Sequence, residues 1–106
     1  MHNNLASGKW FTLSLAEQLG NIGSEIGRVK REKVRNSPSL QNAVDRALEL
    51  FDLTLADARW RGRLKEIARA REVFCDALLG GKEYQSTLED IDRYFLQFGM
   101  LARRNS

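Results

Sequence analysis

A single proline, Pro38, interrupts this chain of 106 residues, so long helices are permitted on both of its sides. Leucine and alanine together number 25, whereas valine, isoleucine and threonine together number 11. The first two residue types favour helices, and the three β-branched types favour strands. No segment alternates apolar and polar residues over the length of a strand. The sequence therefore predicts an all-α protein.

Four segments carry apolar residues three or four positions apart, which is the spacing of one helical face. The first is expected over residues 10–33. The second begins near Ser37, which can cap it with Pro38 in the first helical position, and continues to Leu55. The residues expected to form the buried faces of these two helices are Leu15, Leu19, Ile22, Ile26, Val29, Leu40, Val44, Ala47, Leu48, Phe51 and Leu55.

The third helix is expected from a cap at Asp57 to the glycine pair at residues 80 and 81, a typical helix end. A capping-box pattern over residues 86–89 predicts the start of the fourth. The apolar faces of these helices are Trp60, Leu64, Ile67, Phe74, Leu78, Leu88, Ile91, Phe95, Phe98 and Ala102. Short connections make consecutive helices antiparallel neighbours. We therefore expect an antiparallel up-down four-helix bundle, a single domain over residues 1–106 with a flexible N-terminus over residues 1–9.

The composition also limits the class and the compartment of the protein. Charged residues make up 29% of the chain, and no apolar run approaches the roughly 18 residues of a membrane span. The single cysteine, Cys75, cannot form an intrachain disulfide and is expected to be an inert core thiol. These features predict a cytoplasmic protein that does not contact a membrane.

A stripe of small residues lies beside the apolar stripe of the first helix and includes Gly20, Gly23 and Gly27. Each glycine inside a helix costs about 1 kcal/mol relative to alanine, so three of them need compensation. Close approach of another helix within the fold is the simplest explanation. Packing against a second subunit and a break in the helix near residues 20–23 remain alternatives.

Basic residues crowd the predicted third helix, where Arg59, Arg61, Arg63, Lys65, Arg69 and Arg71 follow one another closely. Arg61, Lys65 and Arg69 recur every four residues and are expected on one face. Positive charge near a helix N-terminus opposes the helix dipole. One interpretation is a set of salt bridges to an acidic stripe on the second helix: Asp45, Glu49 and Asp52. The others are a surface for the phosphates of RNA or DNA, and a contact for an acidic protein partner.

Antiparallel packing would bring the end of the fourth helix beside the start of the third. Arg103 and Arg104 are therefore expected to join Arg59, Arg61 and Arg63 at one end of the bundle. Trp60 lies within this group and could stack on a base, although its spacing favours a core position.

Signatures of catalysis are weak. The only histidine, His2, stands near the start of the chain, which argues against histidine-based triads and zinc sites. Two pairs of carboxylates three residues apart, Glu49 with Asp52 and Glu89 with Asp92, would hold a magnesium ion if they met in one cleft. Capping, salt pairing and solvation explain them more simply. We expect no enzyme, no cofactor and no metal.

Two segments, residues 10–25 (WFTLSLAEQLGNIGSE) and residues 64–72 (LKEIARARE), resemble a family of small, uncharacterised prokaryotic all-helical proteins. In size, charge and helix count the chain is also similar to the basic four-helix bundles of ribosomal intervening sequences and of retroelement accessory proteins. That resemblance is architectural, and it implies oligomerisation and nucleic-acid binding.

The predicted function is a non-enzymatic binding or scaffold module that self-associates into a homo-oligomer. It would bind RNA or DNA phosphate through the basic residues of the third helix, or else an acidic protein. One alternative is a magnesium-dependent enzyme acting on nucleotides through Glu49, Asp52, Glu89 and Asp92. Another is a purely structural subunit of a larger complex, with the glycine-lined helix as its contact.

Overall fold

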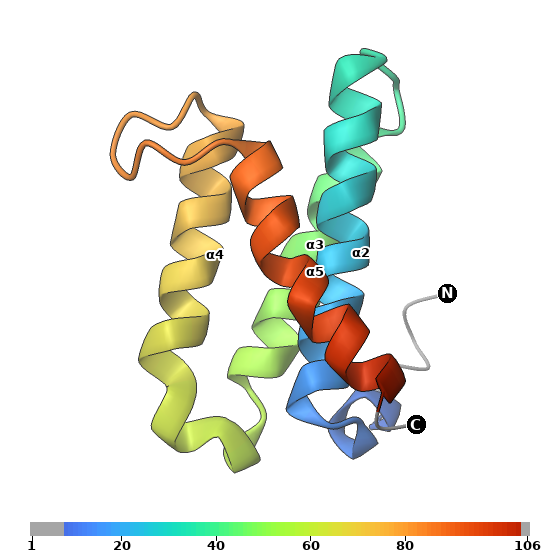
Figure 1. The fold of residues 1–106 in the computed structure, drawn as a ribbon, viewed down its shortest axis with the longest axis vertical. Coiled ribbons are helices and arrows are strands. Elements are labelled where there is room, and N and C mark those ends of the chain that lie inside the picture. The colour runs from blue at the N-terminus through green and yellow to red at the C-terminus, as the bar shows by residue number, and fades with distance from the viewer. Residues whose placement is uncertain (1–7, 105–106) are drawn as a thin grey trace.

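A computed structural model describes residues 8–104 of the chain. Four α-helices and two short 3-10 helices, labelled η1 and η2, make up this part. In chain order they are η1 (Lys9–Thr12), α2 (Leu15–Val34), α3 (Leu40–Leu55), η2 (Ala58–Arg63), α4 (Leu64–Leu78) and α5 (Leu88–Arg104). Successive α-helices alternate in direction (Figure 1), so the predicted up-down four-helix bundle is confirmed.

The start of the first helix differs from the prediction. Residues 1–7, most of the segment expected to be flexible, lie outside the described part, and Lys9 belongs to η1. The first α-helix begins at Leu15 rather than near residue 10, because Ser14 and Glu17 form a capping box. The Ser14 hydroxyl accepts a hydrogen bond from the Glu17 amide at 3.1 Å, and the Ser14 amide donates to the Glu17 carboxylate at 2.8 Å.

The fourth α-helix begins with a capping box, as predicted, but the box lies one residue later in the chain. The capping box of α5 is made by Thr87 and Asp90 instead of Ser86 and Glu89. The Thr87 amide donates to the Asp90 carboxylate at 3.0 Å, and the Thr87 hydroxyl accepts from the Asp90 amide at 3.1 Å. The hydrogen bonds from Thr87 also lower the pKa of Asp90.

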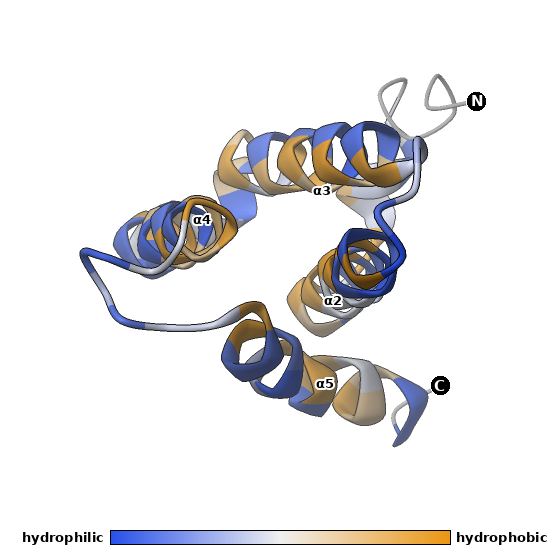
Figure 2. Ribbon diagram, turned by 90° about the horizontal axis from the view of Figure 1, so that it is seen from above, coloured by the Kyte–Doolittle hydropathy of each residue, from blue (hydrophilic) through white to orange (hydrophobic). Residues whose placement is uncertain are grey.

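The core lies where the apolar faces of the four helices meet (Figure 2). Phe51 is its centre, with ring centroids 5.9 Å from Phe74 and 5.8 Å from Phe95. The predicted core residues Leu19 and Ile67 are buried too. α2 lies between α3 and α5 and packs extensively on both, whereas α4 makes fewer contacts with either of its neighbours.

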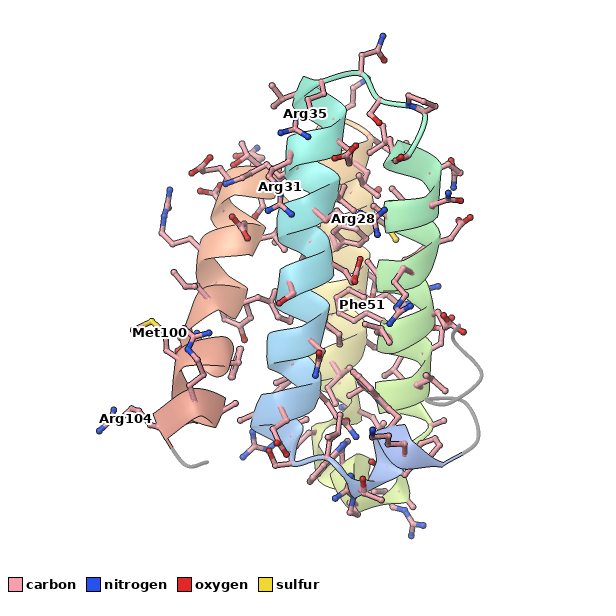
Figure 3. All side chains as sticks on the ribbon, turned by 90° about the vertical axis from the view of Figure 1, so that its right-hand side faces the viewer. Arg28, Arg31, Arg35, Phe51, Met100 and Arg104 are labelled. Carbon is pink, nitrogen blue, oxygen red and sulfur yellow. The ribbon has the colours of Figure 1, made fainter. Side chains whose placement is uncertain are left out.

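The second half of α2 and its C-cap residue carry a row of basic side chains, Arg28, Arg31 and Arg35 (Figure 3). Arg28 and Arg35 each lie near a glutamate three residues earlier, at 3.9 Å from Glu25 and 3.7 Å from Glu32. Cations at this end of a helix complement its dipole, so this row stabilises α2 locally. Within residues 8–104 no helix has both the length and the apolar character needed to cross a bilayer.

Candidate functional site

A run of exposed residues with several cations lies on η2 and the first turns of α4. Residues 61–66 are all exposed, and three of them are cations: Arg61, Arg63 and Lys65. Arg63 is 4.0 Å from Glu66, a contact between two exposed side chains that contributes at most about 1 kcal/mol. Arg61 and Lys65 form no ion pair within residues 8–104. We call Arg61, Arg63, Lys65 and the nearby exposed Arg69 the basic surface.

A break in the helix changes the geometry that the sequence predicted for these residues. The predicted third helix is divided, because residues 58–63 form η2 and Trp60 has non-helical backbone angles (φ −100°, ψ 23°). Lys65 and Arg69 remain four residues apart on α4 and share a face, but Arg61 lies outside that helix. The prediction of one helical face for all three was therefore wrong for Arg61. The Arg69 guanidinium lies 5.5 Å from the ring centre of Tyr84.

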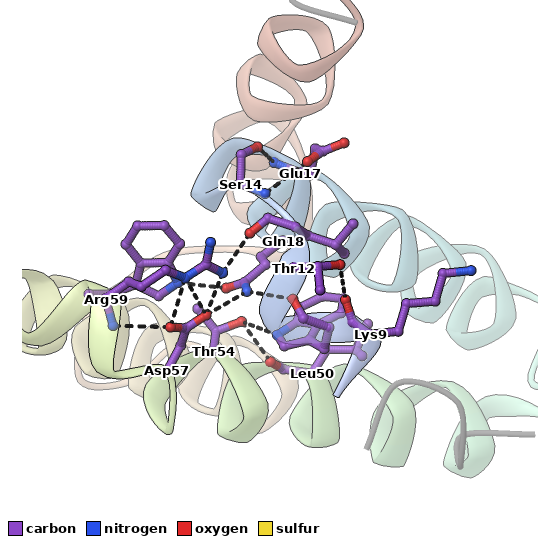
Figure 4. A network of polar contacts seen from close by, with 12 residues as sticks. Lys9, Thr12, Ser14, Glu17, Gln18, Leu50, Thr54, Asp57 and Arg59 are labelled. Carbon is purple, nitrogen blue, oxygen red and sulfur yellow. Dashed lines mark hydrogen bonds and ion pairs between the residues drawn. The ribbon is translucent and has the colours of Figure 1, made fainter. Parts of the chain in front are cut away.

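Arg59 is occupied within the fold (Figure 4). Its guanidinium donates to the buried Asp57 carboxylate at 2.7 Å and to the backbone oxygen of Leu13 at 2.6 Å. It also lies 4.4 Å from the ring centre of Trp60. The hydrogen bonds from Arg59 lower the pKa of Asp57 to about 2. Arg59 therefore positions η2 and is not a free member of the predicted nucleic-acid site.

A buried glutamine connects this ion pair to the rest of the bundle. The Gln18 amide nitrogen donates to the Trp10 backbone oxygen at 2.9 Å and to Asp57 at 3.0 Å. Its oxygen accepts from the Trp60 indole at 2.8 Å. The Trp10 indole in turn donates to Thr54 at 3.2 Å. The network therefore ties η1, α2, α3 and η2 together and holds the segment that carries Arg61 and Arg63.

The sequence predicted the position of one residue of this network, Trp60, but not the role of another, Gln18. Trp60 is partly buried against the core, and its indole nitrogen is already hydrogen-bonded, which favours the core interpretation over base stacking. Gln18 was missed altogether. It stands three residues after Leu15 and four before Ile22, which places a polar residue on the apolar stripe. Such a residue must find hydrogen-bond partners when it is buried, and this was the signal in the sequence.

The C-terminal end of α5, which carries Arg103 and Arg104, points toward the same end of the bundle as η2 (Figure 1). Arg103 lines a groove between α2 and α5, whereas Arg63 lines a smaller groove between α4 and α5. Arg103 and Arg63 thus line grooves on different sides of α5, and a single cluster of these arginines stays a prediction. Arg104 is exposed at the end of α5.

The three glycines of α2 lie against α5 of the same chain. A Cβ atom on Gly20 would lie 3.0 Å from the Cα atom of Gly99, and one on Gly23 would lie 2.8 Å from the Cβ atom of Phe95. A Cβ on Gly27 would lie 3.2 Å from the Asp92 carboxylate. α2 is continuous across all three positions, so the alternative of a helix break near residues 20–23 was wrong.

The four carboxylates considered for magnesium are not brought together. Asp52 accepts a hydrogen bond from Arg71 at 3.0 Å, between α3 and α4. Asp92 and Glu89 lie on α5 at 2.8 Å and 3.5 Å from Lys30 of α2, and the hydrogen bond with Asp92 raises the pKa of Lys30. In the part of the chain that the structure describes, no three potential metal-ligating side chains gather in one place.

Comparison of the chain with protein-family models, with curated proteins and with solved structures finds no significant match, so the site is interpreted from its own residues.

Proposed function

We propose that this chain is a non-enzymatic binding module that holds the phosphate backbone of a nucleic acid on the basic surface. The observation that carries the proposal is the pair of exposed cations without an ion-pair partner within residues 8–104, Arg61 and Lys65, in the uninterrupted exposed run 61–66. Arginine and lysine neutralise phosphates, and arginine does so with two parallel hydrogen bonds.

The local energetics indicate that these cations serve to bind a partner and not to stabilise the fold. Cations before and within the first turn of α4 oppose the helix dipole, at about 0.3–1 kcal/mol each. The ionic network of the fold neutralises Arg59, yet it leaves Arg61 and Lys65 in solvent. A locally unfavourable arrangement without internal compensation is typical of a functional surface.

The hydrogen bonds that hold η2 in the fold also support nucleic-acid binding. Because Gln18, Asp57 and Arg59 fix η2 through hydrogen bonds, its cations Arg61 and Arg63 extend from a segment held by the fold. An acidic protein partner is less favoured, because the arginine hot spots of protein interfaces are accompanied by buried tryptophan and tyrosine anchors, which the run 61–66 lacks. Leu64, 37% exposed, is the one large apolar side chain within the run 61–66.

The test measures the binding of fluorescent single-stranded RNA, single-stranded DNA and duplex DNA at several salt concentrations. The triple variant Arg61→Gln, Lys65→Gln, Arg69→Gln should lose binding, and its dependence on salt should fall. Each lost phosphate contact lowers the logarithmic salt slope by about 0.7–0.9.

A matched control removes the same charge from the other end of the bundle: Arg31→Gln, Arg35→Gln and Lys82→Gln. The affinity of this control for nucleic acid should decrease less than that of the basic-surface variant. The decrease should also be the same for every nucleic acid tested. Equal losses in the two triple variants would show that total charge, and not the basic surface, governs binding. Failure of the wild-type chain to bind any of the three nucleic acids at low salt would contradict the proposal.

A further inference from the structure

The outer side of α5 carries apolar side chains that the bundle leaves uncovered. Leu96 is 56% exposed and Met100 is 52% exposed, and their four-residue spacing places them on one face. Figure 3 shows Met100 on the side of α5 that faces away from α2. The inner face of α5 is already filled by Ile91 and Phe95, so the core does not need these two side chains.

The charges on this face are arranged with opposite signs about Leu96. Glu89 and Arg103 each lie seven residues from Leu96, which is close to two helical turns, so both share its face. A parallel pair of such helices would place like charges together. An antiparallel pair centred on Leu96 would place Glu89 of each copy opposite Arg103 of the other.

The surface next to this face also has the shape that self-association requires. Leu96 forms one wall of the groove between α2 and α5, which has a volume of about 490 Å³ and is lined by Gly20, Gly23 and Gly27. A two-fold interface needs a patch that complements itself, with a protrusion beside a hollow. Leu96 is exposed at the edge of this groove, so a protruding side chain and a hollow lie side by side.

We propose that two copies of this chain form a two-fold dimer in which the α5 helices pack antiparallel through a stripe of five residues. This stripe, which we call the α5 stripe, consists of Glu89, Arg93, Leu96, Met100 and Arg103. The proposal is independent of nucleic-acid binding, because the basic surface lies on η2 and α4.

The first test measures the molar mass of the purified chain without nucleic acid, by light scattering and sedimentation. The expected mass is twice the 12.1 kDa of one chain. The variant Leu96→Glu, Met100→Glu should have the mass of one chain. The control variant Val34→Glu, Leu79→Glu introduces the same charge at two apolar residues that are 84% and 81% exposed elsewhere, and it should keep the dimer mass.

The second test examines the orientation by exchanging charges. Glu89→Arg and Arg103→Glu should each weaken dimerisation by about tenfold at low salt, since each places like charges opposite one another. The double variant Glu89→Arg, Arg103→Glu should restore it, because opposite charges meet again. Both substitutions oppose the dipole of α5, so restored dimerisation cannot come from a more stable helix.

Three results would overturn the proposal. The first is a wild-type chain that remains monomeric at concentrations up to about 200 µM. The second is a Leu96→Glu, Met100→Glu variant that keeps the dimer mass. The third is a double charge exchange that fails to restore dimerisation. The triple variant of the basic surface should stay dimeric. Its result therefore separates a failure of this proposal from a failure of nucleic-acid binding.

Discussion

Gly20 and Gly99 meet backbone to backbone, because a Cβ atom on Gly20 would lie 3.0 Å from the Gly99 Cα atom. This contact allows α5 to lie close against α2 along the glycine stripe. The helix propensity lost at the glycines is thereby offset by close packing within one chain.

Replacing Gly23 with alanine should destabilise the protein, although alanine is the better helix former. The new Cβ atom would lie 2.8 Å from the Cβ atom of Phe95, and neither atom can move without a shift of α2 or α5. Overpacking of about 1–3 kcal/mol exceeds the gain of about 1 kcal/mol in propensity, so the free energy of unfolding should fall. Urea denaturation measures the change.

The matched control is Gly62→Ala, where a Cβ atom would have nothing within 4 Å. Its free energy of unfolding should change by less than about 0.5 kcal/mol. A Gly23→Ala variant as stable as the wild type would contradict close packing at this position.

Replacing Gln18 with leucine should destabilise the fold by about 2–4 kcal/mol, since it leaves the Trp60 indole without its acceptor and removes one donor from the buried Asp57 carboxylate. Thermal and urea unfolding measure the loss. Gln41→Leu is the control, because Gln41 is exposed and bonds only locally, to Asp45. Similar losses in the two variants would show that the buried network contributes little.

The ion pair between Asp57 and Arg59 should make stability depend on pH in the acid range. The pKa of Asp57 is about 2 in the folded chain against 3.8 for a free aspartate, so the folded state binds fewer protons. The resulting stabilisation, about 2 kcal/mol, is present above pH 4 and is lost as the pH falls toward 2.

The measurement compares the wild type with Asp57→Asn from pH 6 downward. The difference in unfolding free energy between them should shrink as the pH approaches 2. A difference that stays constant over this range would show that Asp57 does not carry the effect.

Removing the hydroxyl of either helix cap should cost about 1 kcal/mol of unfolding free energy. Ser14→Ala affects the start of α2, and Thr87→Ala affects the start of α5. Ser24→Ala is the control, since its hydroxyl bonds back to the Gly20 carbonyl within the helix and caps nothing. Circular dichroism during denaturation follows all three variants. Equal stabilities in the cap variants and the control would contradict the capping role.

The helical bundle was predictable because its core residues follow local periodicity. Leu19, Phe51, Ile67 and Phe95 all stand on apolar stripes, and all four are buried together. Burying such a stripe requires only that neighbouring helices be antiparallel, which the short connections ensure.

The support of the candidate site could not be predicted, because it depends on partners far apart in the chain. Gln18 bonds to Asp57 and Trp60, which are 39 and 42 residues away. These contacts hold residues 58–63 as a 3-10 turn, although the sequence continues a helical pattern there. Tertiary hydrogen bonds thus override local propensity, and they decide which cations share a face.

The modest packing of α4 on its neighbours has a consequence for motion. Helices with few buried contacts open at a lower free energy than the whole chain unfolds, and their amide protons then exchange with solvent first. Residues 64–78 should accordingly exchange deuterium faster than residues 15–34, which are held on two sides. The helix that carries Lys65 and Arg69 can then adjust to the contour of a ligand while the other three keep the domain folded.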